Sequence, residues 1–169
     1  TACVEVGKIR SECIAEVSEA IEAINYNIAQ IEKNEGFTHK MAPGAPGENT
    51  QSTLRPYGAW VVISPFNFPL MLASGMTQTA LMTGNTVVIK PTSEAPLATL
   101  GFYHALREAG VPPGVINFVT GPGSSMESAI ADNPEVAGIG FTGSKEIGVQ
   151  LRNAFLTKQP FSKPILCEM

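Results

Sequence analysis

Short apolar segments alternate with helical ones from residue 60 onward, and this alternation restricts the chain to few folds. The apolar segments are rich in Val, Ile and Phe and have the length of strands that are buried on both faces of a sheet. Predicted strands cover residues 60–64, 86–90, 115–119, 136–141 and 164–168. Predicted helices cover residues 70–83, 96–109, 124–131 and 144–156. Because right-handed crossovers connect such strands, the pattern predicts an α/β fold with a doubly wound parallel sheet of about five strands.

A regular stripe of Ile and Val precedes the first predicted strand. It consists of Ile14, Val17, Ile21, Ile24, Ile28 and Ile31, which follow one another at intervals of three and four residues. This spacing places them on one face of a helix and leaves most glutamates of residues 12–22 outside that face. The stripe predicts an amphipathic helix packed on the domain, with a short coiled coil as the alternative. Residues 36–51 are rich in Gly, Pro and Asn, so we expect a loop or linker there, with short extended arms.

The composition excludes several classes of protein. The chain has 169 residues, of which 44% are hydrophobic and 15% charged, and this balance is typical of one globular domain. A formal net charge of −4 without a basic block argues against nucleic-acid binding. No apolar run approaches the roughly 20 residues that cross a bilayer, and no signal-peptide pattern is present. We therefore expect no membrane partner and a cytoplasmic location.

The three cysteines, Cys3, Cys13 and Cys167, form no CxxC pair. This pattern disfavours both a disulfide framework and a thiolate metal site, so we expect free thiols and no bound metal. Cys167 adjoins Glu168 on a predicted strand. Because neighbours on a strand point to opposite faces, Cys167 is expected to point away from any site that Glu168 serves.

The first predicted strand ends in a segment with a candidate catalytic group. Residues 64–69 read Ser-Pro-Phe-Asn-Phe-Pro, with Asn67 between two aromatic residues. In doubly wound folds, ligands bind beyond the carboxyl ends of the strands. There the Asn67 amide could donate a hydrogen bond to an oxyanion. The alternative is that Asn67 only caps the helix that starts near Pro69.

The other strand ends carry weaker signals. Lys90 and Glu94 flank hydroxyl residues that suit a sugar or a phosphate, although a solvated loop is also consistent. Residues 120–125 contain glycines before a helix. Residues 141–148 contain a GxxxxG that opens a helix but lacks both the GxGxxG fingerprint and the P-loop lysine. Glu168 ends the last strand and is either a candidate base or a surface residue.

Taken together and in order, these segments resemble the aldehyde dehydrogenase superfamily from about Glu5 to the last residue. The matching segments are PFNFP at 65–69, GNTVVIKP at 84–91, AGVPPGVINFV at 109–119 and FTGS at 141–144, and Glu168 follows Ser144 by 24 positions. The early helix and the Gly/Pro-rich loop resemble the lead-in and the oligomerisation arm of that family.

The resemblance implies oxidation of an aldehyde to a carboxylic acid through a cysteine thiohemiacetal and thioester. By resemblance, Asn67 stabilises the oxyanion and Glu168 is the general base that activates the hydrolytic water. The nucleophilic Cys of the family belongs to a segment that would follow Glu168, so we expect it outside this chain. The chain alone is then expected to be inactive.

The resemblance also implies an NAD or NADP cofactor. It would place Lys90 on the adenosine ribose, Ser144 on the pyrophosphate at a helix N-terminus, and Thr142 near the nicotinamide. Gly143 and Gly148 are expected where the backbone stays close to the cofactor. The other residues expected at the cofactor are Ser64, Pro65, Phe66, Ser93, Glu94, Gly123 and Phe141.

Two of these residues depart from the family's pattern. Phe66 stands where the family usually has Trp, which keeps an aromatic wall. Ser93 aligns with the acid that commonly binds the ribose hydroxyls, and Glu94 is one position later. A small hydroxyl leaves room for the 2′-phosphate of NADP, whereas a carboxylate would repel it. The choice between NAD and NADP therefore stays open.

By this resemblance the chain has three parts. Residues 1–35 form a helical lead-in of the cofactor domain, residues 36–55 an arm of the oligomerisation type or a linker, and residues 56–169 an NAD(P)-binding, Rossmann-like domain that ends before the catalytic domain. A small-molecule aldehyde and a homodimer or homotetramer are the implied partners. Residues 47–50 and 151–164 look like those of enzymes that oxidise glutamate 5-semialdehyde, which forms from 1-pyrroline-5-carboxylate.

A second hypothesis belongs to another class of protein. The chain could be a nucleotide-binding or assembly module that keeps the fold without catalysis. A downstream Gly-Gln-x-Cys segment would favour the enzyme, and a natural stop codon after Met169 would favour the module.

Overall fold

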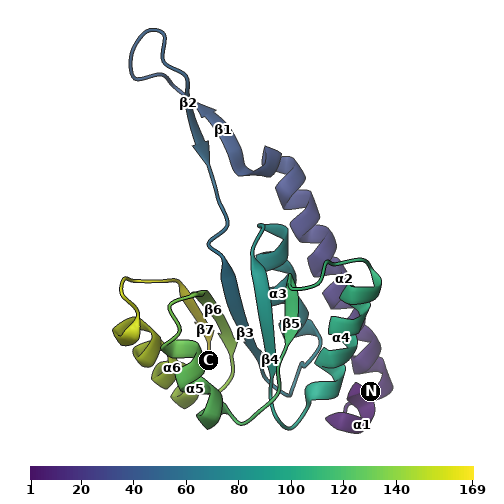
Figure 1. The fold of residues 1–169 in the computed structure, drawn as a ribbon. Coiled ribbons are helices and arrows are strands. Elements are labelled where there is room, and N and C mark those ends of the chain that lie inside the picture. Colours follow the sequence, from purple (N-terminus) through teal and green to yellow (C-terminus); the bar gives the residue numbers. More distant parts are fainter.

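The computed structural model describes residues 1–169 and has a five-stranded parallel sheet at its centre (Figure 1). The strands are β3 (Ala59–Ser64), β4 (Thr86–Pro91), β5 (Ile116–Phe118), β6 (Val136–Thr142) and β7 (Ile165–Glu168). Their spatial order is β5-β4-β3-β6-β7. The chain therefore starts in the middle, runs outward through β4 and β5, and then crosses to the other side of β3. This order confirms the predicted doubly wound, Rossmann-like fold.

Helices cover both faces of the sheet. They are α3 (Met71–Met82) and α4 (Pro96–Glu108) on one face, and α5 (Gly123–Ala131) and α6 (Lys145–Lys158) on the other. Neighbouring residues of β3 point to opposite faces, so Val61 packs in the cluster that includes Phe155 of α6, while Val62 packs with Phe102 of α4. The sheet thus has a separate hydrophobic core on each side.

The N-terminal helix forms as predicted, but it packs through a different face. After the short α1 (Ala2–Glu5), α2 (Arg10–Lys33) lies against α3. Its buried residues are Glu16 and Ala20. The stripe that was expected to pack on the domain is largely exposed, with Ile14 60% and Ile21 53% accessible. The prediction was wrong about the face because the Glu16 carboxylate binds backbone N–H groups of α3 and turns that side of α2 inward.

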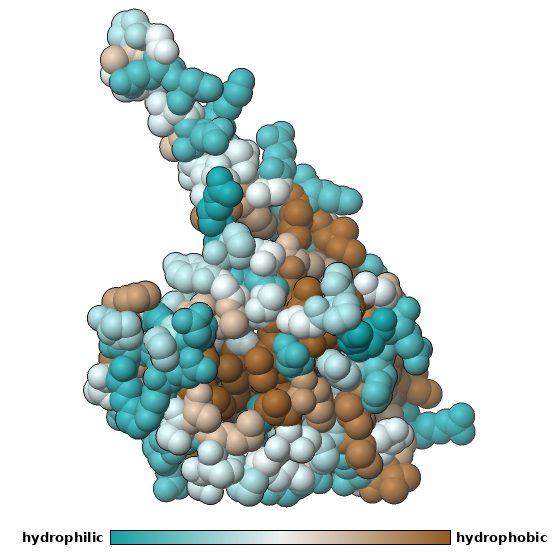
Figure 2. Space-filling model, in the orientation of Figure 1, coloured by the Kyte–Doolittle hydropathy of each residue, from teal (hydrophilic) through white to brown (hydrophobic).

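The Gly/Pro-rich segment forms an arm. A 3₁₀ turn, η1 (Glu35–Phe37), leads into β1 (Thr38–Met41), which pairs with β2 (Thr50–Thr53) in an antiparallel hairpin. The hairpin projects from the body of the molecule in Figure 1, and Figure 2 shows that its surface is mostly hydrophilic. The sequence predicted extended arms here but not their pairing.

No helix combines the length and the apolar character needed to cross a membrane. No group of three or more His, Cys, Asp or Glu side chains is placed to hold a metal ion.

Candidate functional site

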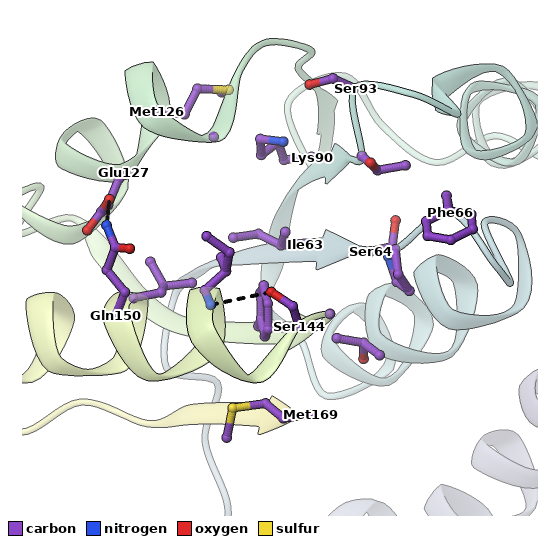
Figure 3. Close-up of a pocket in the computed structure, with 18 of the residues that line it drawn as sticks. Ile63, Ser64, Phe66, Lys90, Ser93, Met126, Glu127, Ser144, Gln150 and Met169 are labelled. Carbon is purple, nitrogen blue, oxygen red and sulfur yellow. Dashed lines mark hydrogen bonds between the residues drawn. The ribbon is translucent and has the colours of Figure 1, made fainter.

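A cleft of about 920 Å³ lies at the carboxyl ends of β3, β4, β6 and β7 (Figure 3). This is the point where the chain switches from one side of β3 to the other, which is the usual ligand position in a doubly wound sheet. All the site residues predicted from the sequence line the cleft except Gly148. They are Ser64, Pro65, Phe66, Asn67, Lys90, Ser93, Glu94, Gly123, Phe141, Thr142, Gly143, Ser144 and Glu168.

Ser64, the last residue of β3, is buried without a partner. It is 2% exposed, and its Oγ makes no hydrogen bond although it lies at the cleft. A buried hydroxyl without a partner costs free energy. A bound polar group in the cleft would satisfy it.

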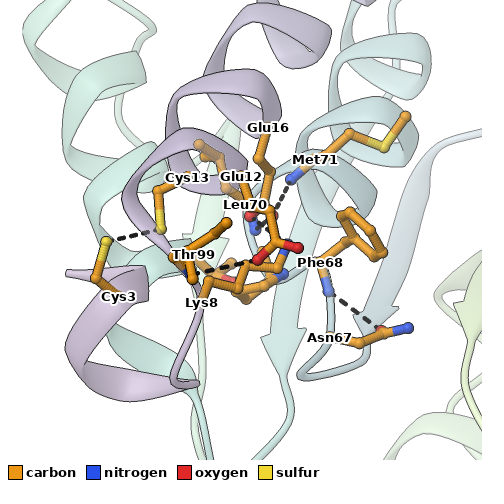
Figure 4. A network of polar contacts seen from close by, with 12 residues as sticks. Cys3, Lys8, Glu12, Cys13, Glu16, Asn67, Phe68, Leu70, Met71 and Thr99 are labelled. Atoms are coloured by element: carbon orange, nitrogen blue, oxygen red, sulfur yellow. Dashed lines mark hydrogen bonds and ion pairs between the residues drawn. The ribbon is translucent and has the colours of Figure 1, made fainter.

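Asn67 does not cap a helix. Its Oδ1 accepts a hydrogen bond from the N–H of Phe68 at 3.1 Å, next to the start of α3. The first N–H groups of α3, those of Leu70 and Met71, donate instead to Glu16 of α2. In Figure 4, the amide nitrogen of Asn67 points away from Phe68. The helix-cap alternative is therefore wrong, and the amide nitrogen of Asn67, a residue that lines the cleft, donates to no acceptor in the chain.

The end of β4 brings a cation and a carboxylate to the same rim. Lys90 is buried, its Nζ donates to the carbonyl of Pro91 at 3.0 Å, and burial lowers its pKa. The Thr92 hydroxyl donates to the Glu94 carboxylate, and this hydrogen bond lowers the pKa of Glu94. The Ser93 side chain is directed toward the loop between β5 and α5, because its Oγ donates to the Gly121 carbonyl at 3.0 Å. Glu94 is thus held ionised near Lys90.

The end of β6 is followed directly by the N-terminus of α6, which is a position where anions can bind. Ser144 caps α6, where its Oγ accepts a hydrogen bond from the Ile147 N–H at 3.4 Å. The positive end of this helix dipole faces the cleft. The N–H of Gly143 is already used, because it donates to the Glu168 carbonyl at 3.1 Å.

Gly148 lies beneath the cleft rather than on its wall. A Cβ at this position would lie 2.5 Å from the Met169 sulfur and 3.0 Å from Cε1 of Phe141. The absence of a side chain therefore makes room for two residues that do line the cleft.

The side chains of Cys167 and Glu168 at the end of β7 point in different directions, as expected. Glu168 lines the cleft. Cys167 faces α6, with its Sγ 3.8 Å from the Gly148 carbonyl, and burial raises the pKa of its thiol. The prediction that Cys167 points away from the site is confirmed.

Sequence reasoning missed the side walls of the cleft. Glu127 of α5 and Gln150 of α6 face each other there, and the Gln150 Nε2 donates to the Glu127 carboxylate at 2.7 Å. Met126 and Met169 also line the cleft. Glu127 lies four residues after Gly123, so it follows the cleft-facing start of α5 by about one turn. That spacing was the sequence signal that could have placed Glu127 at the cleft.

The residues of the cleft fit a ligand that carries phosphate and sugar groups. The N-termini of α5 and α6 and the Lys90 ammonium attract anions, and the Glu94 carboxylate accepts hydrogen bonds from hydroxyls. The volume also falls in the range of small-molecule and cofactor sites.

Comparisons with known proteins agree with this geometry. The family model described as "Aldehyde dehydrogenase family" matches residues 1–169. A 1-pyrroline-5-carboxylate dehydrogenase of Anoxybacillus flavithermus is 36% identical over 98% of this chain and 32% of its own length. One of Bacillus cereus is 37% identical over the same shares. The chain thus spans about a third of the length of these curated relatives.

Solved structures with the same fold carry related names. The structure of "proline utilization A (PutA) with proline bound in remote sites" has a TM-score of 0.91 and 36% identity over 99% of this chain and 17% of its own. An NAD-dependent benzaldehyde dehydrogenase from Corynebacterium glutamicum has a TM-score of 0.87 and 30% identity over 98% of this chain and 35% of its own. The match of the family model over residues 1–169 shows that the chain belongs to the aldehyde dehydrogenase family.

Proposed function

We propose that this chain is the cofactor-binding part of an NAD(P)-dependent dehydrogenase that oxidises an aldehyde to a carboxylic acid. The observation that carries the proposal is a single cleft lined by an amide donor, a carboxylate and a phosphate-binding helix start: Asn67, Glu168 and Ser144. The names of the relatives, all dehydrogenases, support it.

The cofactor would lie along the cleft from β4 to β6. Lys90 and Glu94 would hold the adenosine ribose, and Ser144 with the N-terminus of α6 would hold the pyrophosphate. Thr142 and Phe66 would lie near the nicotinamide. When bound, NAD(P)⁺ supplies an acceptor for the hydride of the aldehyde.

The proposal gives Asn67 and Glu168 different roles in the reaction. The Asn67 amide would donate to the oxyanion that forms when a thiolate attacks the aldehyde. Glu168 would take a proton from the water that hydrolyses the resulting thioester. None of Cys3, Cys13 and Cys167 lines the cleft, so the proposal assigns the nucleophile to a cysteine outside residues 1–169.

The names of the relatives and the shape of the arm support a proposal for the substrate and for the assembly. The relatives named 1-pyrroline-5-carboxylate dehydrogenase favour glutamate 5-semialdehyde, which would be oxidised to glutamate. The projecting β1–β2 hairpin suits a homo-oligomer, in which it would pair with a second copy. We place the protein in the cytoplasm.

Calorimetric titration with NAD and NADP tests the cofactor site on this chain directly. We expect binding of at least one dinucleotide, and an affinity about 10–100-fold lower for Lys90→Met, because a hydrogen bond from a charged group is lost. Lys158→Met is the matched control, since Lys158 pairs with Asp132 at the far end of α6. Circular dichroism establishes that each variant is folded. A folded chain that binds neither dinucleotide contradicts the proposed site.

The Glu94 carboxylate is expected to favour NAD over NADP. It is held ionised at the rim of the cleft, where it would repel a 2′-phosphate. Glu94→Gln should therefore raise the affinity for NADP relative to NAD by about tenfold. Glu127→Gln, which removes the same charge from the opposite wall, should leave the ratio of the two dissociation constants nearly unchanged. Equal shifts of this ratio in both variants would show that the cofactor preference depends only on the total charge of the cleft and not on the position of Glu94.

A further inference from the structure

The first two cysteines meet at a helix junction that lies outside the cleft. Cys3 is on α1 and Cys13 is on the first turn of α2, and their sulfur atoms lie 2.9 Å apart (Figure 4). Between the helices, Gly7 adopts a φ of +70°, a conformation that side chains disfavour. This bend folds α1 back onto α2. The sequence predicts free thiols, because the cysteines form no CxxC pair.

The two thiols differ in their readiness to react. The two sulfur atoms share a hydrogen bond in which either thiol can be the donor, and this bond raises the pKa of Cys13. Cys3 is exposed and is therefore the first thiol that an oxidant meets. The third cysteine has no such partner, since the Cys167 thiol lies against the Gly148 carbonyl.

The junction also carries two carboxylates, one on α1 and one on α2, that accept hydrogen bonds from N–H groups at the starts of α4 and α3. Glu5 of α1 accepts hydrogen bonds from the N–H groups of Leu97 at 2.5 Å and Ala98 at 2.8 Å, in the first turn of α4. Glu16 of α2 caps α3 in the same way. The loops that precede α3 and α4 line the cleft. A covalent link between α1 and α2 would therefore tie both caps together.

We propose that Cys3 and Cys13 form a reversible disulfide with a peroxide as the oxidant. The Cys3 thiolate attacks a peroxide oxygen, the O–O bond breaks, and a sulfenic acid forms as hydroxide leaves. The Cys13 sulfur then attacks the Cys3 sulfur, the S–O bond breaks, and the Cys13 proton leaves with the hydroxyl group as water. In sum, two thiols and one hydrogen peroxide give one disulfide and two waters. A dithiol reductant reverses the reaction.

Mass spectrometry of the peroxide-treated chain tests the bond itself. The monomer should lose two hydrogen atoms, about 2 Da, and trypsin should release residues 1–8 joined to residues 11–33. Dithiothreitol should restore the original mass. Cys167→Ser should behave like the parent chain, whereas Cys3→Ser and Cys13→Ser should not form the link. Disulfide-linked dimers, or oxygen atoms retained on Cys3 instead of a link to Cys13, would overturn the proposal.

Thermal unfolding and hydrogen exchange test the consequence for the caps. A disulfide that closes a short loop should raise the midpoint by about 4–8 °C over the reduced chain. The amides of Leu97 and Ala98 should exchange more slowly after oxidation, while those of α6 serve as the internal control. The rise should persist in Cys167→Ser and be absent from Cys13→Ser. A link that forms without slowing these amides would refute the coupling to the α4 cap.

Discussion

Replacement of Asn67 by alanine, in an enzyme that contains this chain, is expected to slow acylation by about 10²–10³-fold. Asn67 lines the cleft with Thr142 and Glu168, its Oδ1 accepts from the Phe68 N–H, and its amide N–H groups have no acceptor in the chain. A preorganised donor of this kind acts on charge that develops only in the transition state. The measurement is the rate constant of the initial NAD(P)H burst.

Glu168→Gln distinguishes this role from general damage to the cleft. Hydride transfer precedes hydrolysis, so this variant should retain the burst and lose steady-state turnover. Asn67→Asp, similar in size but unable to donate when ionised, should lose the burst as the alanine variant does. A burst rate constant unchanged in Asn67→Ala would remove Asn67 from the reaction.

The layers of the fold were readable from the sequence because the central strands β3, β4 and β6 are buried on both faces. Val61 and Val62 serve different cores, so β3 appears as a continuous apolar run, and each run is followed by a helix of adequate length. The bounds of β3 and β4 differ from the predicted ones by a single residue at one end. Local pattern is sufficient here because strand, crossover helix and next strand are neighbours in the chain.

The orientation of α2 could not be read in the same way. Hydrophobic periodicity identifies the apolar face of a helix, but packing here follows a carboxylate whose partners are 54 and 55 residues away. Asn67 was open to a capping role for the same reason, since the true cap, Glu16, comes from another element. Side-chain contacts at such separations depend on the finished fold.

The residues of the candidate site also fall into two groups, those that the sequence could predict and those that it could not. The residues at the strand ends, such as Lys90 and Ser144, follow from topology and from the resemblance. Glu127 and Gln150 lie on helices, where a polar residue is equally consistent with solvent exposure. One sequence does not distinguish the two environments.

Glu16 is expected to be the most sensitive charged residue for stability. It is 1% exposed, its carboxylate lies 2.9 Å from the Lys8 Nζ, and it accepts the N–H groups of Leu70 and Met71 at 2.8 and 3.0 Å. Glu16→Ala would leave a largely buried ammonium and two N–H groups without an acceptor. Breaking a buried pair in this way costs about 3–5 kcal/mol, which should lower the midpoint of thermal unfolding by about 6–20 °C.

Three further variants isolate the cause of this loss. Glu22→Ala removes an exposed carboxylate from the same helix and should change the unfolding free energy by no more than about 0.5 kcal/mol. Glu16→Gln keeps an oxygen acceptor for α3 but loses the charge, so it should lie between the two. Lys8→Met combined with Glu16→Gln should recover part of the stability, because the unpaired ammonium is then gone. If Glu16→Ala proves no more harmful than Glu22→Ala, α3 is held by its packing on the sheet and not by this carboxylate, and the exposed stripe of α2 then needs another explanation.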